Sequence, residues 1–385
     1  MDLKLVPHAE PTLSERAALE AVLGPPASGW DGGAREAGVD GNTASGGHAV
    51  RARRHLLLPA LWALQERIGW ISPGGLNEVC RRLTVPPADA YGVATFYALL
   101  ALEPRPPRVV HVCDDIACRC HGAQGLVAQL EERFGPEEEL SDDGSTTWYR
   151  SPCLGQCDRA PAALISIAGE TPFERAQAPV TATAVLGLLA GGEPGPAPSA
   201  SLPQAGDPEL RLLRRVGVVD PASLDEYRAH GGYAALRRAF ELGPEGVLRE
   251  VKDSKLVGRG GAAFPTGVKW EAVARQPARP HYLVCNADES EPGTFKDRAL
   301  MEGDPFAVVE AMTIAAYATG CERGYVYLRG EYPEARDALE HALSEARQRG
   351  FLGGDVMGEG FGFDIEVRRG AGAYICGEET AIFES

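Results

Sequence analysis

Residues 258–270 read GRGGAAFPTGVKW, a stretch with four glycines, Arg259 and Lys269 toward its two ends and Phe264 between them. Glycine tolerates positive φ and lets a ligand approach the bare backbone N–H groups. A run of such N–H groups beside two cations suits an anion such as a phosphate. A glycine-rich surface loop without a ligand is the alternative interpretation. The sequence on either side has to decide between the two.

Strands and helices alternate after this loop. Strands are expected at residues 281–286, 325–328 and 361–367, and helices at 304–320 and 334–349. This order predicts a largely parallel sheet covered by helices, in which ligands bind beyond the carboxyl ends of the strands. The usual Rossmann fingerprint fits poorly. Gly258-x-Gly260-x-x-Ala263 has its spacing, but no clear strand precedes it and no lone acid lies about 20 residues further on.

Two loops of this region carry acidic side chains. Residues 286–298 read NADESEPGTFKDR, just past an expected strand, and residues 370–380 read GAGAYICGEET. Carboxylates repel phosphate but accept hydrogen bonds from ribose hydroxyls, a carboxamide or a flavin ring N–H. A solvated acidic turn and a divalent-ion site remain alternatives. The acids concerned are Asp288, Glu289, Glu291, Glu378 and Glu379.

Two closely spaced cysteine pairs lie upstream, Cys113-x4-Cys118 and Cys153-x3-Cys157. Thiolates bind soft metals and iron–sulfur clusters, and four of them satisfy a [2Fe–2S] cluster with two per iron. Zinc and no metal at all stay open as alternatives. Cys120 is interpreted as a bystander. The four scattered cysteines are expected to be small core residues; they are Cys80, Cys285, Cys321 and Cys376.

The chain divides into five parts. Residues 1–48 are expected to be weakly structured, with one possible short helix at 13–23. Residues 49–102 predict a bundle of three helices, in which Ser72 caps the second and the third extends through Leu100. Residues 103–190 predict a small α/β unit of order β-α-β-β-α with cysteines on its loops. Residues 191–208 are a Pro- and Gly-rich linker, and residues 209–385 are the α/β domain that holds the glycine loops.

Composition excludes several classes of partner. The formal net charge of −16 disfavours nucleic acid and anionic lipid surfaces. The sequence contains no apolar run of the roughly 18 residues that a membrane span requires, and no secretory segment at its start. The expected location is cytoplasmic, with attachment to the inner face of a membrane only through partner subunits.

Residues 55–157 resemble the 24-kDa-type subunit of respiratory complex I, a thioredoxin-like [2Fe–2S] protein. The matching stretches are GVATFY at 92–97, CDDIAC at 113–118 and PCLGQCDRAP at 152–161. The resemblance extends to a helical bundle ahead of the first cysteine. It implies that Cys113, Cys118, Cys153 and Cys157 hold a [2Fe–2S] cluster.

The glycine loops and the acidic loop together resemble the 51-kDa-type NADH-oxidising flavoprotein of complex I. They are equally similar to its relatives in NAD-linked formate dehydrogenases and bidirectional hydrogenases. The resemblance implies a Rossmann-like FMN- and NADH-binding domain over residues 209–385. It implies FMN contacts for Gly258, Arg259, Gly260, Gly261, Lys269, Asn286, Asp288, Glu289, Gly377 and Glu378. It also implies NADH contacts for Phe264, Glu291 and Glu379.

Three departures from that family stand out. Ala263 replaces a usual glycine, and Ala272 replaces a usual aromatic or large apolar residue. The family also continues past the position of Ser385, with a Cys-x-x-Cys-x-x-Cys motif for a [4Fe–4S] cluster. We therefore expect this domain to be C-terminally truncated and the [4Fe–4S] cluster to belong to a longer gene product.

The function expected from these resemblances is an NADH-oxidising electron-input module. Hydride passes from NADH to FMN, and single electrons then pass to iron–sulfur clusters, with other iron–sulfur subunits as partners. One alternative is the diaphorase subunit of an NAD-dependent formate dehydrogenase or hydrogenase. A second alternative is a truncated, non-catalytic iron–sulfur carrier.

Overall fold

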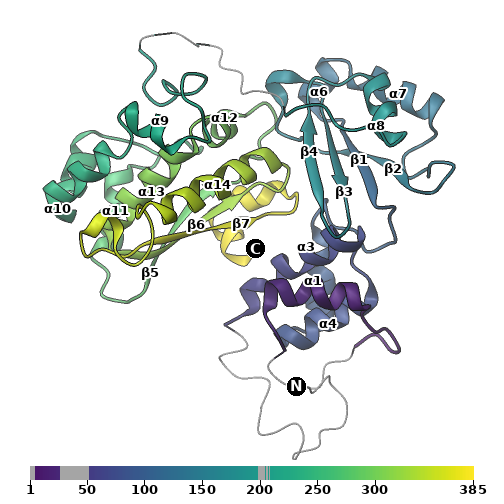
Figure 1. The fold of residues 1–385 in the computed structure, drawn as a ribbon, viewed down its shortest axis with the longest axis horizontal. Coiled ribbons are helices and arrows are strands. Elements are labelled where there is room, and N and C mark those ends of the chain that lie inside the picture. The colour runs from purple at the N-terminus through teal and green to yellow at the C-terminus, as the bar shows by residue number, and fades with distance from the viewer. Residues whose placement is uncertain (1–4, 27–51, 198–203, 205–206, 208) are drawn as a thin grey trace, which may run out of the picture.

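The computed structural model describes residues 5–26, 52–197, 204, 207 and 209–385. Figure 1 shows three parts: a helical bundle, a four-stranded sheet with its helices, and a three-stranded sheet with its helices. Residues 27–48 of the expected N-terminal segment lie outside the described residues, as do 198–203, 205–206 and 208 of the linker.

The bundle is built from α1 (Leu13–Leu23), α3 (Leu57–Ile68), α4 (Pro73–Leu83) and α5 (Pro87–Phe96), with a short η1 (Arg54–Leu56) before α3. The Ser72 hydroxyl accepts the Gly75 N–H at 2.9 Å, so the predicted cap of α4 is confirmed. Helix α1 packs on α3 and α4 through its buried leucines, so the bundle also includes residues before 49. The predicted third helix is too long. It ends at Phe96, and Tyr97 is extended.

The second part of the fold begins with β1 (Arg108–Cys113). Its sheet has the order β2-β1-β3-β4, with β1 and β2 parallel and the other pairs antiparallel. The predicted order lacked β4, because its sequence FERAQ is polar and gives no apolar alternation. The remaining elements are α6 (Ile116–Cys120), α7 (Ala123–Arg133), β2 (Thr146–Ser151), η2 (Cys157–Arg159), β3 (Ala163–Ile167), β4 (Phe173–Gln177) and α8 (Ala182–Leu189).

In the third part, the predicted parallel sheet is confirmed, with the order β5-β6-β7. Helix α13 packs on β5 and β6, and α14 packs on β7. The predicted end of α13 is also confirmed, because Gly320 caps it in the left-handed region at φ 66°. The elements are α9 (Leu224–Ala229), α10 (Ala234–Asp253), α11 (Thr266–Ala274), β5 (His281–Ala287), α12 (Lys296–Gly303), α13 (Pro305–Thr319), β6 (Cys321–Leu328), α14 (Pro333–Gln348), η3 (Val356–Gly358), β7 (Asp364–Arg369), η4 (Tyr374–Gly377) and α15 (Glu379–Glu384).

None of the helices in the described part of the chain is long and apolar enough to cross a membrane. The third part contacts both of the others directly. Tyr97 of the bundle hydrogen-bonds with Ser385 at 2.5 Å, and Arg298 of α12 hydrogen-bonds with the carbonyl of Gly155 at 3.0 Å.

Candidate functional site

Sheet register brings the two cysteine pairs to one edge. Strands β1 and β2 are parallel, and Cys113 lies opposite Ser151 at their carboxyl ends. The first pair follows β1 into α6, which Asp115 caps with its side chain. The second pair follows β2, and the same Asp115 carboxylate accepts the Cys153 N–H at 3.1 Å. One aspartate thus joins the two cysteine loops.

The four sulfur atoms form a chain of contacts. Sγ of Cys153 lies 3.4 Å from Sγ of Cys157, and the neighbouring thiols of Cys118 and Cys153 raise the pKa of Cys113. Hydrogen bonds from Cys113 and Cys157, helped by the charge of Arg329, lower the pKa of the Cys153 thiol. The two cysteine loops thus bring four thiols together at one edge of the sheet, and a [2Fe–2S] cluster needs two thiolates for each iron.

Backbone N–H groups also point at the sulfurs. Sγ of Cys153 accepts the Gly155 N–H at 3.3 Å, and Sγ of Cys157 accepts the Gly293 N–H at 3.2 Å. The second donor belongs to the acidic loop that follows β5. Cys120, by contrast, is exposed.

The three loops singled out in the sequence converge beyond the carboxyl ends of β5 and β7. The Asn286 amide donates to the Gly377 carbonyl at 2.9 Å, and the Tyr374 hydroxyl donates to Glu291 at 2.5 Å. Lys269 of α11 forms an ion pair with Glu379. Each loop therefore touches another, although 83 to 110 residues separate the partners along the chain.

Asp288 lies where these loops meet. Its Oδ1 accepts the Ser290 hydroxyl at 2.9 Å, whereas its Oδ2 is buried and has no hydrogen-bond partner. Burial raises the pKa of this carboxyl to about 6, and the charge of Glu331 adds to the rise. A Cβ at Gly377 would lie 3.2 Å from the Asp288 carbonyl oxygen, which is tighter than usual. An unsatisfied buried acceptor beside a bare glycine backbone fits a ligand with ring N–H donors.

The first glycine loop is open. Gly258, Arg259, Gly260 and Gly261 are exposed, and a Cβ at Gly260 or Gly261 would meet nothing within 4 Å. Phe264 is 52% exposed, and Lys269 is exposed as well. Ala263 has φ 44°, in the left-handed region that favours glycine, so the alanine noted in the sequence carries backbone strain.

Glu289 is placed differently from its neighbours. Its carboxylate is buried and accepts the N–H groups of Asp297 and Arg298 at 2.9 and 3.0 Å, at the start of α12. The Tyr332 hydroxyl donates to it at 3.2 Å. The carboxylate is thereby taken up in fixing the acidic loop to α12. The Glu289 carbonyl is also occupied, by Arg329 and Tyr332, so its backbone N–H is the group left for other contacts.

Sequence analysis missed two buried arginines that join the cysteine loop to the acidic loop. Arg298 pairs with Asp158 at 2.5 Å and is 1% exposed. Arg329 donates to the Glu289 carbonyl at 2.7 Å and also to the Cys153 carbonyl. Their partners on the cysteine loop lie 140 and 176 residues away in the chain, so no local pattern could reveal them.

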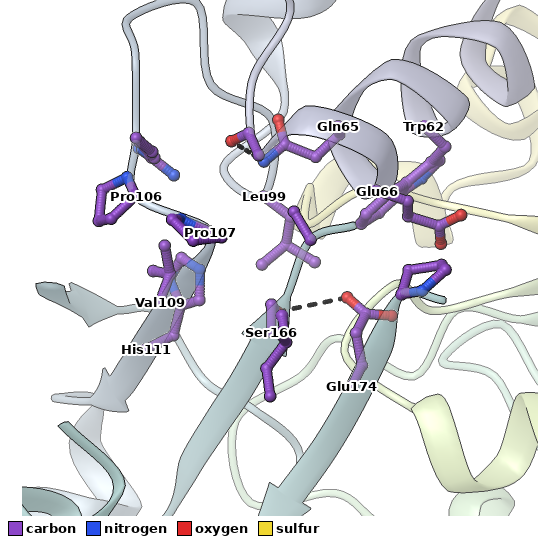
Figure 2. Close-up of a pocket in the computed structure, with 15 residues that line it drawn as sticks. Trp62, Gln65, Glu66, Leu99, Pro106, Pro107, Val109, His111, Ser166 and Glu174 are labelled. Carbon is purple, nitrogen blue, oxygen red and sulfur yellow. Dashed lines mark hydrogen bonds between the residues drawn. The ribbon is translucent and has the colours of Figure 1, made fainter. Parts of the chain in front are cut away.

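Two neighbouring cavities lie away from these loops, beside α3 and β4. One of about 30 Å³ is lined by residues of α3, β1, β3 and β4 (Figure 2). Its neighbour of about 450 Å³ also reaches α14 and β7. The residues of the first glycine loop line neither cavity and are exposed at the surface. We place the candidate site where the three loops meet, because the unsatisfied acceptor and the bare backbone lie there.

Two family models match the chain. Residues 46–185 match the thioredoxin-like [2Fe-2S] ferredoxin, and residues 251–385 match the Nuo51 FMN-binding domain. The NAD-reducing hydrogenase HoxS subunit alpha of Cupriavidus necator is 37% identical over 349 residues, which are 87% of this chain and 56% of that protein. The F 2 subunit of the NADH-quinone oxidoreductase of Rhizobium meliloti is 54% identical over 175 residues, 45% of this chain and 42% of that protein.

A solved structure shares the architecture of both domains. The crystal structure of an NAD+-reducing [NiFe]-hydrogenase in the air-oxidized state superposes with a TM-score of 0.66 at 27% identity, over 86% of this chain and 55% of that one. The chain spans about half the length of the curated relatives that it matches.

Proposed function

Because residues 46–185 belong to the thioredoxin-like [2Fe–2S] ferredoxins and residues 251–385 to the Nuo51-type FMN-binding domains, we propose that this chain is an NADH-oxidising electron-input module. It takes hydride from NADH at a flavin site and passes single electrons to iron–sulfur clusters. The observation that carries the proposal is the Gly293 N–H bond to Sγ of Cys157, since it places the flavin-side loop against the cluster-side thiol.

The cluster is held by Cys113 and Cys118 on one loop and by Cys153 and Cys157 on the other. Their contacts in two linked pairs, and the N–H bonds to two of the sulfurs, support this assignment. Hydrogen bonds to the sulfurs stabilise the added negative charge of a reduced cluster and so raise its reduction potential.

The proposed flavin site is the place where the three loops meet. Gly258, Gly260 and Gly261 offer backbone N–H groups, and Arg259 and Lys269 offer positive charge to the FMN phosphate. The free Oδ2 of Asp288 accepts a ring N–H. The side chain of Asn286 and the backbone of Glu289, Gly377 and Glu378 complete the wall around the ring.

The dinucleotide is proposed to bind on the exposed side of the same three loops. Phe264 is 52% exposed and offers a face on which NADH stacks. Glu291 and Glu379 accept its hydroxyls or amide N–H groups. In the described structure these two acids are held by Tyr374 and Lys269, and both of those partners are exposed. A ligand can therefore exchange with them without burying an unpaired charge.

The chemistry that FMN supplies when bound is the conversion of a two-electron hydride transfer into single-electron steps. The residues of this chain would hold the flavin beside the dinucleotide and would keep the flavin site at a fixed place relative to the cysteine loops. Arg298 and Arg329 would serve the second purpose, because each bonds to the cysteine loop from the domain that carries the glycine loops.

Reconstitution tests the proposal. The purified chain, supplied with iron, sulfide and FMN, should show [2Fe–2S] absorption, quench FMN fluorescence on binding, and reduce ferricyanide with NADH. A chain that assembles the cluster but binds no FMN would be the non-catalytic carrier instead. If it binds neither group and shows no NADH-dependent reduction, the proposed function is wrong.

A diaphorase of a hydrogenase or formate dehydrogenase is the second candidate. It is favoured by the share of this chain that each relative matches: 87% for the hydrogenase HoxS subunit alpha and 45% for the F 2 subunit of the quinone oxidoreductase. Elemental analysis of the native complex separates the two. Nickel or molybdenum in stoichiometric amount would support the diaphorase, and quinone reduction without either metal would support the complex I type.

In either assembly we propose that other iron–sulfur subunits are the partners that receive the electrons. We also propose a cytoplasmic location, with any membrane attachment made through those subunits. Fractionation of cell extracts with and without the partner subunits would test both points together.

A further inference from the structure

Arg369 lies at the point where the three parts of the fold meet. It ends β7, immediately before the glycine loop at residues 370–377. Its guanidinium carbon lies 3.6 Å from the centre of the Trp62 ring, and its nitrogens bond with Glu66 at 2.9 Å and Glu174 at 2.6 Å. It also donates to the Gly330 carbonyl at 3.0 Å. Partners from all three parts thus fix the base of the loop. Figure 2 shows Trp62 and Glu66 on α3 close to Glu174 on β4.

The helical bundle then holds the loop itself by three consecutive carbonyls. The Gly370 carbonyl accepts the indole N–H of Trp62 at 3.2 Å. The next two carbonyls, of Ala371 and Gly372, accept the backbone N–H groups of Leu99 at 3.0 Å and Ala98 at 3.2 Å. A side chain at Gly372 would clash with Leu99, since its Cβ would lie 3.1 Å from Leu99 Cγ.

The bonds to these three carbonyls also fix the direction in which the N–H groups of the loop point. In a trans peptide the carbonyl of one residue and the N–H of the next point in opposite directions. The N–H groups of Ala371, Gly372 and Ala373 therefore point away from the bundle. Within the described part of the chain these three N–H groups have no protein acceptor. The same loop goes on to Gly377, whose carbonyl accepts the Asn286 amide and where a Cβ would lie 3.2 Å from the Asp288 carbonyl oxygen.

We propose that Trp62 and Arg369 are positioning residues for FMN, and that the N-terminal bundle is in this way part of the flavin site. Trp62 and Arg369 contact no ligand. They hold the carbonyl side of the loop so that its N–H side and the Gly377 backbone stay aligned with Asp288. This inference rests on the proposed function, and it adds a contribution from a part of the chain that lies outside the FMN-binding domain.

The main test is Trp62→Phe, which keeps an aromatic ring under Arg369 and removes the indole donor together with part of the ring volume. The matched control is Trp148→Phe, which makes the same change. Trp148 is also buried and donates the same kind of bond, to the Gly135 carbonyl at 3.2 Å, inside the ferredoxin domain. The dissociation constant of FMN is measured by fluorescence quenching, and hydrogen exchange is measured at Ala98 and Leu99 in the FMN-free chain.

We expect Trp62→Phe to raise the FMN dissociation constant about fivefold, the effect of one net hydrogen bond. It should also speed amide exchange at Leu99 and Ala98. Trp148→Phe should leave both unchanged, even though it lowers the unfolding temperature. Equal FMN affinity of Trp62→Phe and wild type, or equal weakening in the control, would overturn the inference.

A second pair of variants covers the case in which Trp62→Phe fails to fold. Arg369→Lys keeps the charge and loses the planar fork, so it should also weaken FMN binding. Arg336→Lys is its control, because Arg336 bonds with the same Glu174 carboxylate at 3.1 Å from α14. Similar FMN affinities for these two variants would contradict the proposal. A wild-type chain that binds no FMN would refute the proposed function itself, whereas unchanged amide exchange in Trp62→Phe would refute the clamp alone.

Discussion

The pair of Arg298 and Asp158 should be the most costly single contact to break between the ferredoxin domain and the FMN-binding domain. The side chain of Arg298 is 1% exposed and that of Asp158 is 5% exposed, and their atoms lie 2.5 Å apart. Arg298 also donates to the Gly155 carbonyl at 3.0 Å and to Glu302 at 3.1 Å. Replacing Arg298 by Met keeps much of the side-chain volume and removes every donor.

The expected loss in the free energy of unfolding follows from the charge of Asp158, which stays buried when Arg298 is replaced. Breaking a buried ion pair by removing one partner costs about 3–5 kcal/mol when the other charge is left without compensation. Here Arg159 still lies 3.5 Å from Asp158, so we expect a loss at the lower end of that range. Glu302 adds less, since burial raises its pKa to about 7 and it can take up a proton. In Arg298→Met combined with Asp158→Asn neither charge remains. The double variant should then recover about 2–3 kcal/mol relative to the sum of the single variants.

Urea unfolding supplies the measurement, followed by far-UV circular dichroism and, in the cluster-loaded chain, by visible absorption. Arg349→Met is the control, because Arg349 bonds with Asp225 at 2.7 Å on the surface and should change little. If the effects of the two single variants simply add in the double variant, the buried pair is not coupled. The assignment of Arg298 as the bridge between the domains would then be wrong.

Three further outcomes are expected. Cys118→Ser should abolish the [2Fe–2S] absorption, whereas Cys120→Ser, two residues away and exposed, should retain it in full. Ala263→Gly should raise the free energy of unfolding by about 0.5–1 kcal/mol, measured in urea, because it relieves a residue at φ 44°. Asp288 has its pKa raised by burial to about 6 in the folded chain, so its contribution to stability is present below its unfolded pKa and lost as pH rises through 6. Without FMN, wild type should therefore lose about 2–3 kcal/mol relative to Asp288→Asn between pH 4 and 7, and a pH-independent difference would contradict this.

The loops of the candidate site could be predicted from the sequence because their cysteine, acidic and glycine motifs directly follow predicted strands. The cysteine pairs follow two strands that turn out to be parallel neighbours, with Cys113 opposite Ser151. The acidic loop and the second glycine loop follow β5 and β7 of a parallel sheet. Carboxyl ends of parallel strands share one edge, so the convergence of those loops could be expected from the order of the strands.

The features that sequence reasoning missed depend on partners far away in the chain. Strand β4 has the sequence FERAQ, and its Glu174 is buried only because Arg369 and Arg336 arrive from the other domain. The segment after Phe96 leaves the helix because its N–H groups bond with the loop carbonyls of Ala371 and Gly372. Helical periodicity describes one element at a time, so it cannot signal a tertiary bond that ends a helix.

The same long-range contacts decide how the two proposed sites could work together. Transfer of an electron between them needs a fixed separation, and a linker of Pro, Gly and Ser does not set one. The acidic loop does, because Gly293 bonds with Cys157 while Asp288 of the same loop carries the unsatisfied acceptor of the proposed flavin site. Glu289 anchors that loop to α12, and Arg329 ties its backbone to the cysteine loop. A structural change at either site would therefore be transmitted to the other through the acidic loop, which is bonded at both ends. We expect such a change to alter the hydrogen bond from the Gly293 N–H to Sγ of Cys157.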